Sequence, residues 1–263
     1  MKKIVFITTH NWDTKRQGGF HKFAEATALA GIETVFFSFP RPYYGYFMKR
    51  EQLNPQVIRT LKKGISYKVG SGSVLNVTFP TLRLPDAAGR FLPDWLMNCF
   101  LKKSLGSFRS FAKKFLAETD CFVFESCEGV AFVDTIRRLF PKARVIYRPS
   151  DPMVYASVPE RVKALEHHIL QTADLSLIVN QEGVESYKKS IPDFDQKVAY
   201  QVLSNGIDLD SYKKSYAVPA ILNKPNTVLY VGAWEVEWPL LFEAAQKLPQ
   251  CNFVVVCPNY PAD

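Results

Sequence analysis

Several features that would define a function are missing from this sequence of 263 residues. None of the five cysteines forms a Cys-x-x-Cys pair, and their odd number predicts buried free thiols in a reducing compartment. The N-terminal apolar run, Ile4 to Ile7, is too short for the core of a signal peptide. No stretch approaches the ~20 apolar residues of a membrane-spanning helix. We therefore expect a cytoplasmic protein, either free or peripheral on the inner membrane face.

The charge of the chain is strongly positive. Its 47% hydrophobic and 22% charged residues are typical of a globular protein, but the formal net charge is +8. Such a surface suits an anionic partner, such as a phospholipid face, a nucleic acid or a phosphorylated substrate. Scattered Lys and Arg that serve only solubility explain the charge equally well. No nucleic-acid recognition motif accompanies it, so nucleic acid is not an expected partner.

Short β-rich runs alternate with helical patterns along the chain. We expect strands at Ile4–Thr8, Thr34–Phe39, Val74–Phe79, Cys121–Glu125, Arg144–Tyr147, Leu175–Asn180 and Val198–Leu203. We expect helices at Phe20–Ala30, Leu96–Leu116, Val130–Phe140, Val158–Thr172 and Glu182–Lys189. This alternation, with strands rich in Ile, Val and Phe, predicts an α/β fold with a doubly wound parallel sheet covered on both faces.

A polar segment that contains two prolines divides the chain. We interpret residues 212–226 as a linker that follows an N-terminal domain of residues 1–211. After the linker a strand, a helix and a strand are expected at Thr227–Val231, Pro239–Leu248 and Asn252–Cys257. One strand–helix–strand unit does not bury a core of its own. Residues 227–263 therefore look like the truncated start of a second, Rossmann-like domain.

Ligands of doubly wound sheets bind beyond the carboxyl ends of the strands, which directs attention to four loops, those after Thr8, Phe39, Glu125 and Tyr147. In the last of them Arg148 and Asp151 each stand before a proline, and prolines restrict the backbone. A carboxylate in such a rigid loop is well placed to be a general base. The alternative is that Asp151 is a turn or N-cap residue paired with Arg148.

The loop after the first strand gathers polar, cationic and aromatic groups. It contains His10, Trp12 and Arg16, and it ends in Gly18 and Gly19 just before a helix. Glycine lets a ligand approach backbone N–H groups and a helix N-terminus favours an anion, so these residues are candidate substrate contacts. The alternative is an ordinary glycine-containing loop. Neither a dinucleotide nor a metal is expected, because the loop is not Gly-x-Gly-x-x-Gly and matches no metal-ligand spacing.

Two further features leave alternatives open. Glu125, at another strand end, either binds a sugar hydroxyl or caps the following helix, and capping is the commoner role of such a residue. Residues 41–50 and the expected helix Leu96–Leu116 combine aromatic and basic side chains. That pattern fits an interfacial helix facing anionic lipid, and equally a core-facing helix with a solvated basic side.

Two stretches around the linker complete a resemblance. Residues 203–208 read Leu-Ser-Asn-Gly-Ile-Asp, and residues 230–234 read Tyr-Val-Gly-Ala-Trp at the end of the next expected strand. Together they resemble the domain junction of GT-B glycosyltransferases. With the first-strand loop and Tyr-Arg-Pro-Ser-Asp at residues 147–151, the chain resembles the GumK-type glucuronosyltransferase family of xanthan synthesis over nearly its whole length.

This resemblance implies a definite activity. Members of the family are inverting, metal-independent enzymes without a cofactor, which transfer glucuronate from its UDP donor to a lipid-linked oligosaccharide in exopolysaccharide synthesis. The resemblance implies that Asp151 is the catalytic base and that Trp234 lies near a donor contact. Gly232 and Ala233 are candidates to offer N–H groups to the diphosphate. The family's membrane-associated acceptor implies an anionic membrane surface as a partner of the basic, aromatic segments.

Two functions stay open for a chain of this length. In the first, the chain is a glycosyltransferase that is impaired, because most of the family's donor contacts come from segments that would lie beyond Asp263. In the second, it is a non-catalytic GT-B fragment that binds the acceptor or docks on a membrane. Release of UDP by this chain distinguishes the two.

Overall fold

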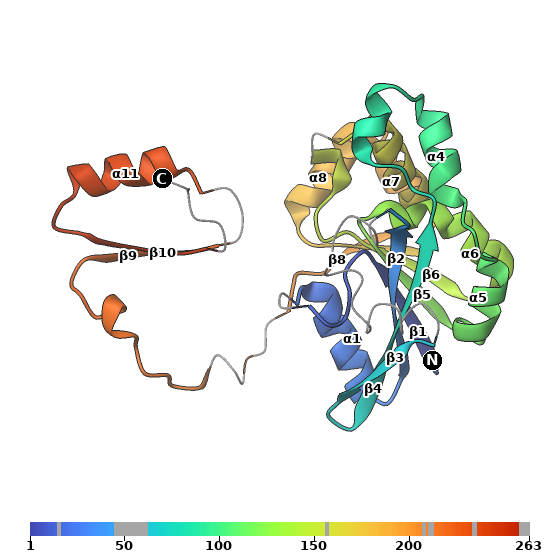
Figure 1. The fold of residues 1–263 in the computed structure, drawn as a ribbon, viewed down its shortest axis with the longest axis horizontal. Coiled ribbons are helices and arrows are strands. Elements are labelled where there is room, and N and C mark those ends of the chain that lie inside the picture. The colour runs from blue at the N-terminus through green and yellow to red at the C-terminus, as the bar shows by residue number, and fades with distance from the viewer. Residues whose placement is uncertain are drawn as a thin grey trace. The chain divides into compact units, whose positions relative to one another are not determined.

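The structure is a computed structural model that describes residues 1–14, 17–44, 63–155, 158–206, 209, 213–232 and 236–257. The chain divides into two compact units, Met1–Gly206 and Ile207–Asp263 (Figure 1). Each unit is described by itself. Within the described residues, no helix is both long enough and apolar enough to cross a membrane.

The larger unit is built on one sheet of eight strands in the order β3-β4-β2-β1-β5-β6-β7-β8. The strands are β1 (Lys3–Thr8), β2 (Glu33–Pro42), β3 (Ile65–Val69), β4 (Gly72–Thr81), β5 (Cys121–Glu125), β6 (Arg144–Arg148), β7 (Leu175–Ile178) and β8 (Tyr200–Val202). Every neighbouring pair is parallel except β3 and β4. The predicted α/β fold with a doubly wound sheet is confirmed, with one correction. The sheet is mostly parallel, because an antiparallel hairpin that was not predicted adds β3 at its edge.

Helices cover both faces of this sheet (Figure 1). They are α1 (Gly19–Leu29), α4 (Asp94–Lys102), α5 (Phe108–Phe115), α6 (Val133–Leu139), α7 (Glu160–Thr172), α8 (Gln181–Ser190) and α9 (Phe194–Lys197). Short 3-10 turns lie at η2 (Asp86–Arg90), η3 (Glu128–Phe132) and η4 (Met153–Tyr155).

The central strand β1 contributes side chains to the hydrophobic core on both faces of the sheet. Successive side chains of a strand point to opposite faces, so a strand covered on both faces must be apolar throughout. Ile4 and Phe6 pack in one cluster with Phe20 and Ala24 of α1. Val5 and Ile7 join the larger cluster on the other face, which includes side chains of α5, α6 and α7. Every residue of β1 is buried, so the strand continues to Thr8 and its loop begins directly after Thr8.

The expected single helix Leu96–Leu116 is wrong, because the structure has two helices here. α4 ends at Lys102, and Lys103 is extended with ψ of 151°. A new helix, α5, starts after Ser107, whose hydroxyl accepts a hydrogen bond from the Ser110 N–H at 3.2 Å. α5 buries Phe111 and Phe115 and leaves its basic residues exposed, so the core-facing alternative holds for it.

The cysteines differ partly from the expectation. All five are free thiols, and Cys121 and Cys127 are buried as expected. Cys99 is exposed, and Cys251 and Cys257 are only half-buried, so the expectation of burial is wrong for these three. Burial raises the pKa of Cys121 to about 11, which keeps its thiol protonated and chemically inert near neutral pH.

The smaller unit contains a parallel pair of strands and one helix. The short turn η5 (Ala220–Leu222) comes first in the chain. β9 (Thr227–Val231) follows it and pairs with β10 (Asn252–Val256), and α11 (Trp238–Lys247) connects the two strands. Among the described residues of this unit only Val254 is buried, at 8% exposure. The expected strand–helix–strand arrangement is therefore present, and most of its apolar side chains are exposed.

Gly72 marks a close approach between the β3–β4 hairpin and α1. A Cβ atom at this position would lie 2.1 Å from the backbone oxygen of Ala28. We expect Gly72→Ala to lower the free energy of unfolding of the larger unit by about 1–3 kcal/mol, the usual cost of overpacking. Urea denaturation followed by circular dichroism measures this loss.

Gly18→Ala is the control, because a Cβ there meets nothing within 4 Å. We expect its loss to be clearly smaller. Equal stabilities of Gly72→Ala and the unchanged protein would show that the hairpin does not press on α1.

Candidate active site

Polar side chains line up at or near the carboxyl ends of four adjacent strands. Thr8 of β1 is in register with Ser38 of β2, and Glu125 of β5 with Arg148 of β6. The Thr8 hydroxyl donates a hydrogen bond to the Glu125 carboxylate, which joins the two pairs. Parallel strands have their carboxyl ends on the same edge of the sheet, the edge where ligands of such folds bind.

Glu125 is buried at the centre of this row, with only 7% of its surface exposed. One carboxylate oxygen accepts the Thr8 hydrogen bond, and the other accepts one from the Ser150 hydroxyl at 2.9 Å. The helix-capping alternative is wrong, because Cys127 is the N-cap of η3 and has no side-chain capping bond. Glu125 instead connects β1 to the loop after β6, and its predicted contact with a sugar stays a prediction.

Arg148 is also buried, at 2% exposure. Its Nη1 donates to the backbone oxygen of Pro149 at 2.7 Å, and its Nη2 donates to Oδ1 of Asn205 at 2.8 Å. Burial lowers the pKa of Arg148, while the nearby Glu125 carboxylate raises it. These hydrogen bonds do not involve Asp151, so the alternative that Asp151 is paired with Arg148 is wrong.

The loop that carries Asp151 is held by hydrogen bonds from β5. The Ser126 hydroxyl oxygen accepts from the N–H of Ser150 at 3.2 Å and from the N–H of Asp151 at 3.3 Å. The Asp151 side chain itself is exposed. Within the part of the chain that the structure describes, its carboxylate has no hydrogen bond or ion pair. The backbone of Asp151 is thus fixed while its carboxylate remains available.

A buried carboxylate holds the far end of the same loop. Glu166 of α7 is fully buried and accepts hydrogen bonds from the hydroxyls of Tyr147 and Tyr187, both at 2.6 Å. Its other oxygen accepts from the N–H of Val154 at 3.0 Å. Burial, with Tyr187 and Glu166 beside it, raises the pKa of Tyr147 well above its ordinary value, so that hydroxyl remains a donor. Glu166 therefore connects β6, α7, α8 and the segment after Asp151.

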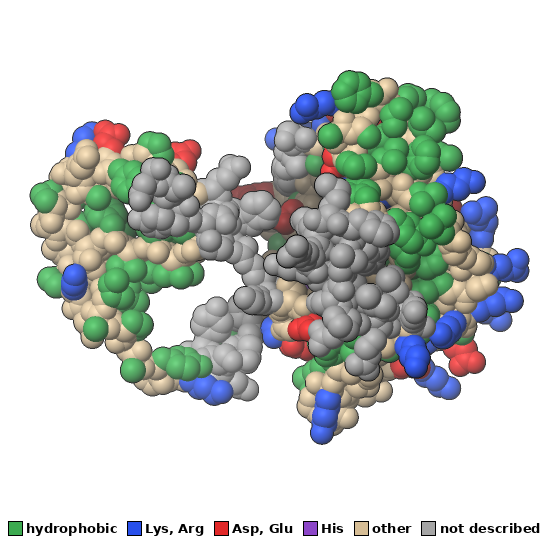
Figure 2. Space-filling view, viewed as in Figure 1, with side chains coloured by type: hydrophobic (Ala, Val, Ile, Leu, Met, Phe, Trp, Pro, Cys, Tyr) green, Lys and Arg blue, Asp and Glu red, His purple; other side chains and the backbone are tan. Residues whose placement is uncertain are grey.

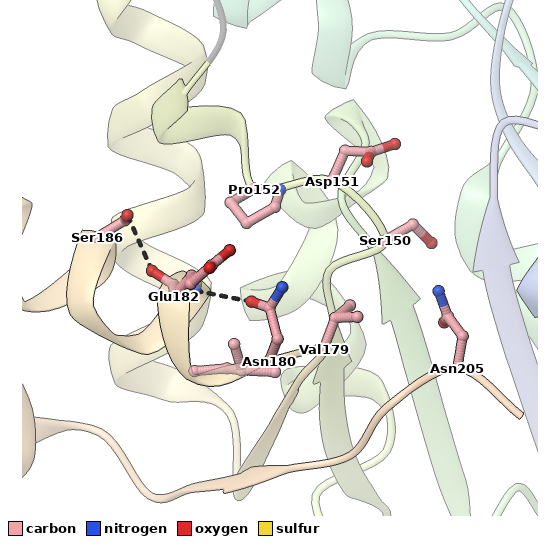
Figure 3. A pocket seen from close by; sticks show the side chains of 10 residues that line it. Ser150, Asp151, Pro152, Val179, Asn180, Glu182, Ser186 and Asn205 are labelled. Carbon is pink, nitrogen blue, oxygen red and sulfur yellow. Dashed lines mark hydrogen bonds between the residues drawn. The ribbon is translucent and has the colours of Figure 1, made fainter.

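A cavity of about 700 Å³ lies beside the Asp151 loop. It is lined by Ser150, Asp151, Pro152, Ile178, Val179, Asn180, Glu182, Gly183, Ser186 and Asn205. This lining contains two carboxylates and no basic side chain, although the whole chain carries a net charge of +8. Figure 3 shows the Asp151 carboxylate at the rim, pointing away from Asn180 and Glu182. Asn180 is held by its own helix, because its Oδ1 accepts from the Gly183 N–H at 2.8 Å.

The loop after β1 is held by His21. Its Nδ1 accepts from the Gly18 N–H at 3.2 Å, so its Nε2 carries the proton and donates to the backbone oxygen of Asn11 at 2.9 Å. Burial lowers the pKa of His21 below its ordinary 6.5, which keeps the ring neutral at pH 7. Trp12 is buried against the rings of Phe36 and His21, so it serves to pack this loop.

The other predicted site residues differ in placement. His10, Gly18 and Gly19 are exposed, and a Cβ on Gly19 would lie 3.7 Å from Oδ1 of Asn205. Asn205, which accepts from Arg148, thus lies near the end of the first-strand loop. The Gly232 N–H already donates to the backbone oxygen of Val256 at 3.1 Å, so it is not free for a diphosphate.

Arg16, Ala233 and Trp234 lie outside the described residues. Among the described residues, no group of three or more His, Cys, Asp or Glu side chains is arranged to hold a metal ion. Sequence reasoning missed Ser126, Glu166 and Asn205, all of which hold the predicted site from distant segments. Only Asn205 had a sequence signal, since it lies in the Ser-Asn-Gly turn before the linker.

We expect the Glu166 side chain to contribute more to the free energy of unfolding than a typical buried side chain. Glu166→Ala leaves two tyrosine hydroxyls and the Val154 N–H without their acceptor. We expect the free energy of unfolding to fall by about 3 kcal/mol or more, from several unsatisfied buried groups at about 1–3 kcal/mol each. Glu166→Gln keeps one acceptor oxygen and should lose clearly less. Equal losses in urea denaturation for the two variants would contradict this account of the carboxylate.

Comparison with known proteins places these features in a family. Residues 6–179 match the family described as glucuronosyltransferase GumK, N-terminal domain, which confirms the resemblance found in the sequence. No curated protein matches the chain by sequence.

Many solved structures match this fold, and two of them illustrate the match. One is described as trehalose-6-phosphate from E. coli bound with UDP-2-fluoro glucose, with a TM-score of 0.59 and 13% identity, covering 98% of this chain and 65% of the other. The second is Arabidopsis thaliana UGT89C1 complexed with UDP-L-rhamnose, with a TM-score of 0.52 and 12% identity, covering 99% of this chain and 70% of the other. The fold is therefore GT-B-like, and the chain belongs to the family of the GumK glucuronosyltransferase N-terminal domain.

Proposed function

We propose that this chain takes part in inverting glycosyl transfer, with Asp151 as the general base. In the proposed step, the Asp151 carboxylate removes the proton from a hydroxyl of the acceptor sugar. The hydroxyl oxygen attacks the anomeric carbon of a UDP-sugar, and UDP leaves from the opposite face, so the configuration inverts. The bond between the anomeric carbon and the diphosphate breaks as the new glycosidic bond forms.

The observation that carries this proposal is the state of Asp151. Its backbone N–H is bound to Ser126, its carboxylate is exposed at the carboxyl edge of the sheet, and a cavity lies beside it. A general base needs a fixed position and a carboxylate that the protein has not already engaged. The acidic lining of the cavity favours acceptor hydroxyls over an anionic group, because like charges repel.

The donor and acceptor of the proposed reaction come from the family. We propose UDP-glucuronate as the donor and a lipid-linked oligosaccharide of exopolysaccharide synthesis as the acceptor. The two related folds were solved with UDP-sugars, which supports a nucleotide-sugar donor. This chain spans 65% of the length of the first of them, so the transfer itself remains our proposal. In a metal-independent reaction, the charge on the leaving UDP is balanced by N–H groups and basic side chains.

The proposed division of labour follows the two units. The larger unit would supply Asp151 and the acceptor cavity, and residues 227–263 would belong to the donor side after a linker at 212–226. The alternative, a non-catalytic unit that binds the acceptor or docks on a membrane, predicts no UDP release with any donor.

Replacement of the proposed base tests the catalytic role. Asp151→Asn has the same shape but does not take up a proton, so we expect turnover to fall by about 10²–10⁴-fold. UDP release by the full gene product, with UDP-glucuronate and a lipid-linked acceptor, measures it. The circular dichroism spectrum should be unchanged.

Asp134→Asn is the matched control, since Asp134 is an exposed aspartate of α6 whose partner is His168, outside the cavity. Its turnover should be unchanged. Turnover near normal in Asp151→Asn would remove Asp151 from the mechanism.

A second function, docking on an anionic membrane, has its own observation. Phe91, Trp95 and Leu105 around α4 are 87%, 70% and 76% exposed. Figure 2 shows hydrophobic side chains gathered over the region of α4, with Lys and Arg along the neighbouring edge. Exposed aromatic rings beside basic side chains are typical of surfaces that enter the interface of an anionic bilayer.

Removal of the exposed rings tests the docking proposal. The double variant Phe91→Ala and Trp95→Ala should lose about tenfold or more in binding to vesicles with anionic phosphatidylglycerol, because the two aromatic rings that would enter the bilayer are lost. Binding of the unchanged protein should weaken as salt rises. Vesicle co-sedimentation measures both effects.

Leu29→Ala is the control, since Leu29 is 54% exposed on α1. It should bind like the unchanged protein. Equal binding of the double variant and the control would contradict docking through α4.

A further inference from the structure

The end of β5 holds the loop of Asp151 through two consecutive residues. We call Glu125 and Ser126 the β5 pair. Glu125 accepts from the Ser150 hydroxyl, and Ser126 accepts from the backbone N–H groups of Ser150 and Asp151. Ser150 is therefore held both through its side chain and through its backbone.

The β5 pair is itself fixed by the sheet. Glu125 is in register with Arg148, and its second carboxylate oxygen accepts the hydrogen bond of Thr8 from β1. Buried side chains surround it, so neither its position nor its hydrogen bonds change easily. The position of the loop is thus set by the central strands of the molecule.

We propose that Ser126 is a positioning residue for the base Asp151, an inference that rests on the proposed function. Its hydroxyl oxygen fixes the orientation of two consecutive peptide groups, and so the direction in which the Asp151 side chain leaves the backbone. The proline neighbours restrict the loop but accept no hydrogen bond from these N–H groups. Without the Ser126 oxygen the loop keeps its restraints at Arg148, at the Ser150 side chain and at Val154, and the peptide groups on either side of Ser150 lose theirs.

This arrangement makes a specific kinetic prediction. Misplacing a catalytic group by about 1 Å can cost about 10²-fold in rate. We expect Ser126→Ala to lower kcat of the full gene product by about 10–100-fold, with the KM for donor and acceptor each within about twofold. Ser126→Thr keeps the hydroxyl and should restore kcat to within about threefold of the unchanged protein.

Ser190→Ala is the matched control. Ser190 belongs to α8 but does not line the cavity, and its hydroxyl donates to the backbone oxygen of Tyr187 at 3.1 Å. We expect it to leave kcat unchanged. Thermal unfolding should show that both alanine variants remain folded at the assay temperature.

Amide hydrogen exchange provides a readout that does not need turnover. In Ser126→Ala the N–H groups of Ser150 and Asp151 should exchange faster, while the Val154 N–H, bound to Glu166, should not. Faster exchange together with a lower kcat and rescue by threonine supports the proposal.

Three outcomes would overturn the proposal: an unchanged kcat in Ser126→Ala, an equal loss in Ser190→Ala, or failure of Ser126→Thr to restore the rate. Normal turnover in Asp151→Asn would instead reject the proposed function. The two experiments therefore distinguish a failure of the Ser126 proposal from a failure of the proposed function.

Discussion

The buried carboxylate of Glu125 is the interaction on which the candidate site depends. It lies at the carboxyl end of a central strand and accepts hydrogen bonds from Thr8 on one side and Ser150 on the other. Burying a carboxylate is costly unless its oxygens are satisfied, and here both are. The same hydrogen bonds that make the burial of Glu125 tolerable also fix the loop of Asp151. Stability of the strand end and geometry of the candidate base are therefore linked.

The Asp151 carboxylate differs in its surroundings from the two carboxylates that hold its loop. Glu125 and Glu166 are buried carboxylates whose oxygens accept from the protein, and together they hold both ends of the loop between them. Asp151 is exposed on that loop beside an acidic cavity. The surroundings thus distinguish two kinds of carboxylate. Those that hold the fold are satisfied internally, and the one that we propose as the base is left open to a substrate.

Sequence patterns predicted the strands well and the support of the site poorly. Continuous apolar runs such as Ile4–Thr8 identify buried strands, and the rule that ligands bind beyond strand ends led to Asp151 without coordinates. The break before Ser107 was missed because apolar spacing continued across it, although Gly106 and the serine cap were visible. The contact between Ser126 and Asp151 joins residues 25 positions apart, and no local pattern encodes such a contact.

The central claim is that the β5 end presents the Asp151 carboxylate to an acceptor hydroxyl. An experimental structure of the protein with an acceptor oligosaccharide bound tests this most directly. We predict a sugar hydroxyl in the cavity within about 2.6–3.2 Å of an Asp151 carboxylate oxygen, with the Ser126 contacts intact. An acceptor bound in another place, with Asp151 facing solvent and no sugar hydroxyl near it, would contradict the account.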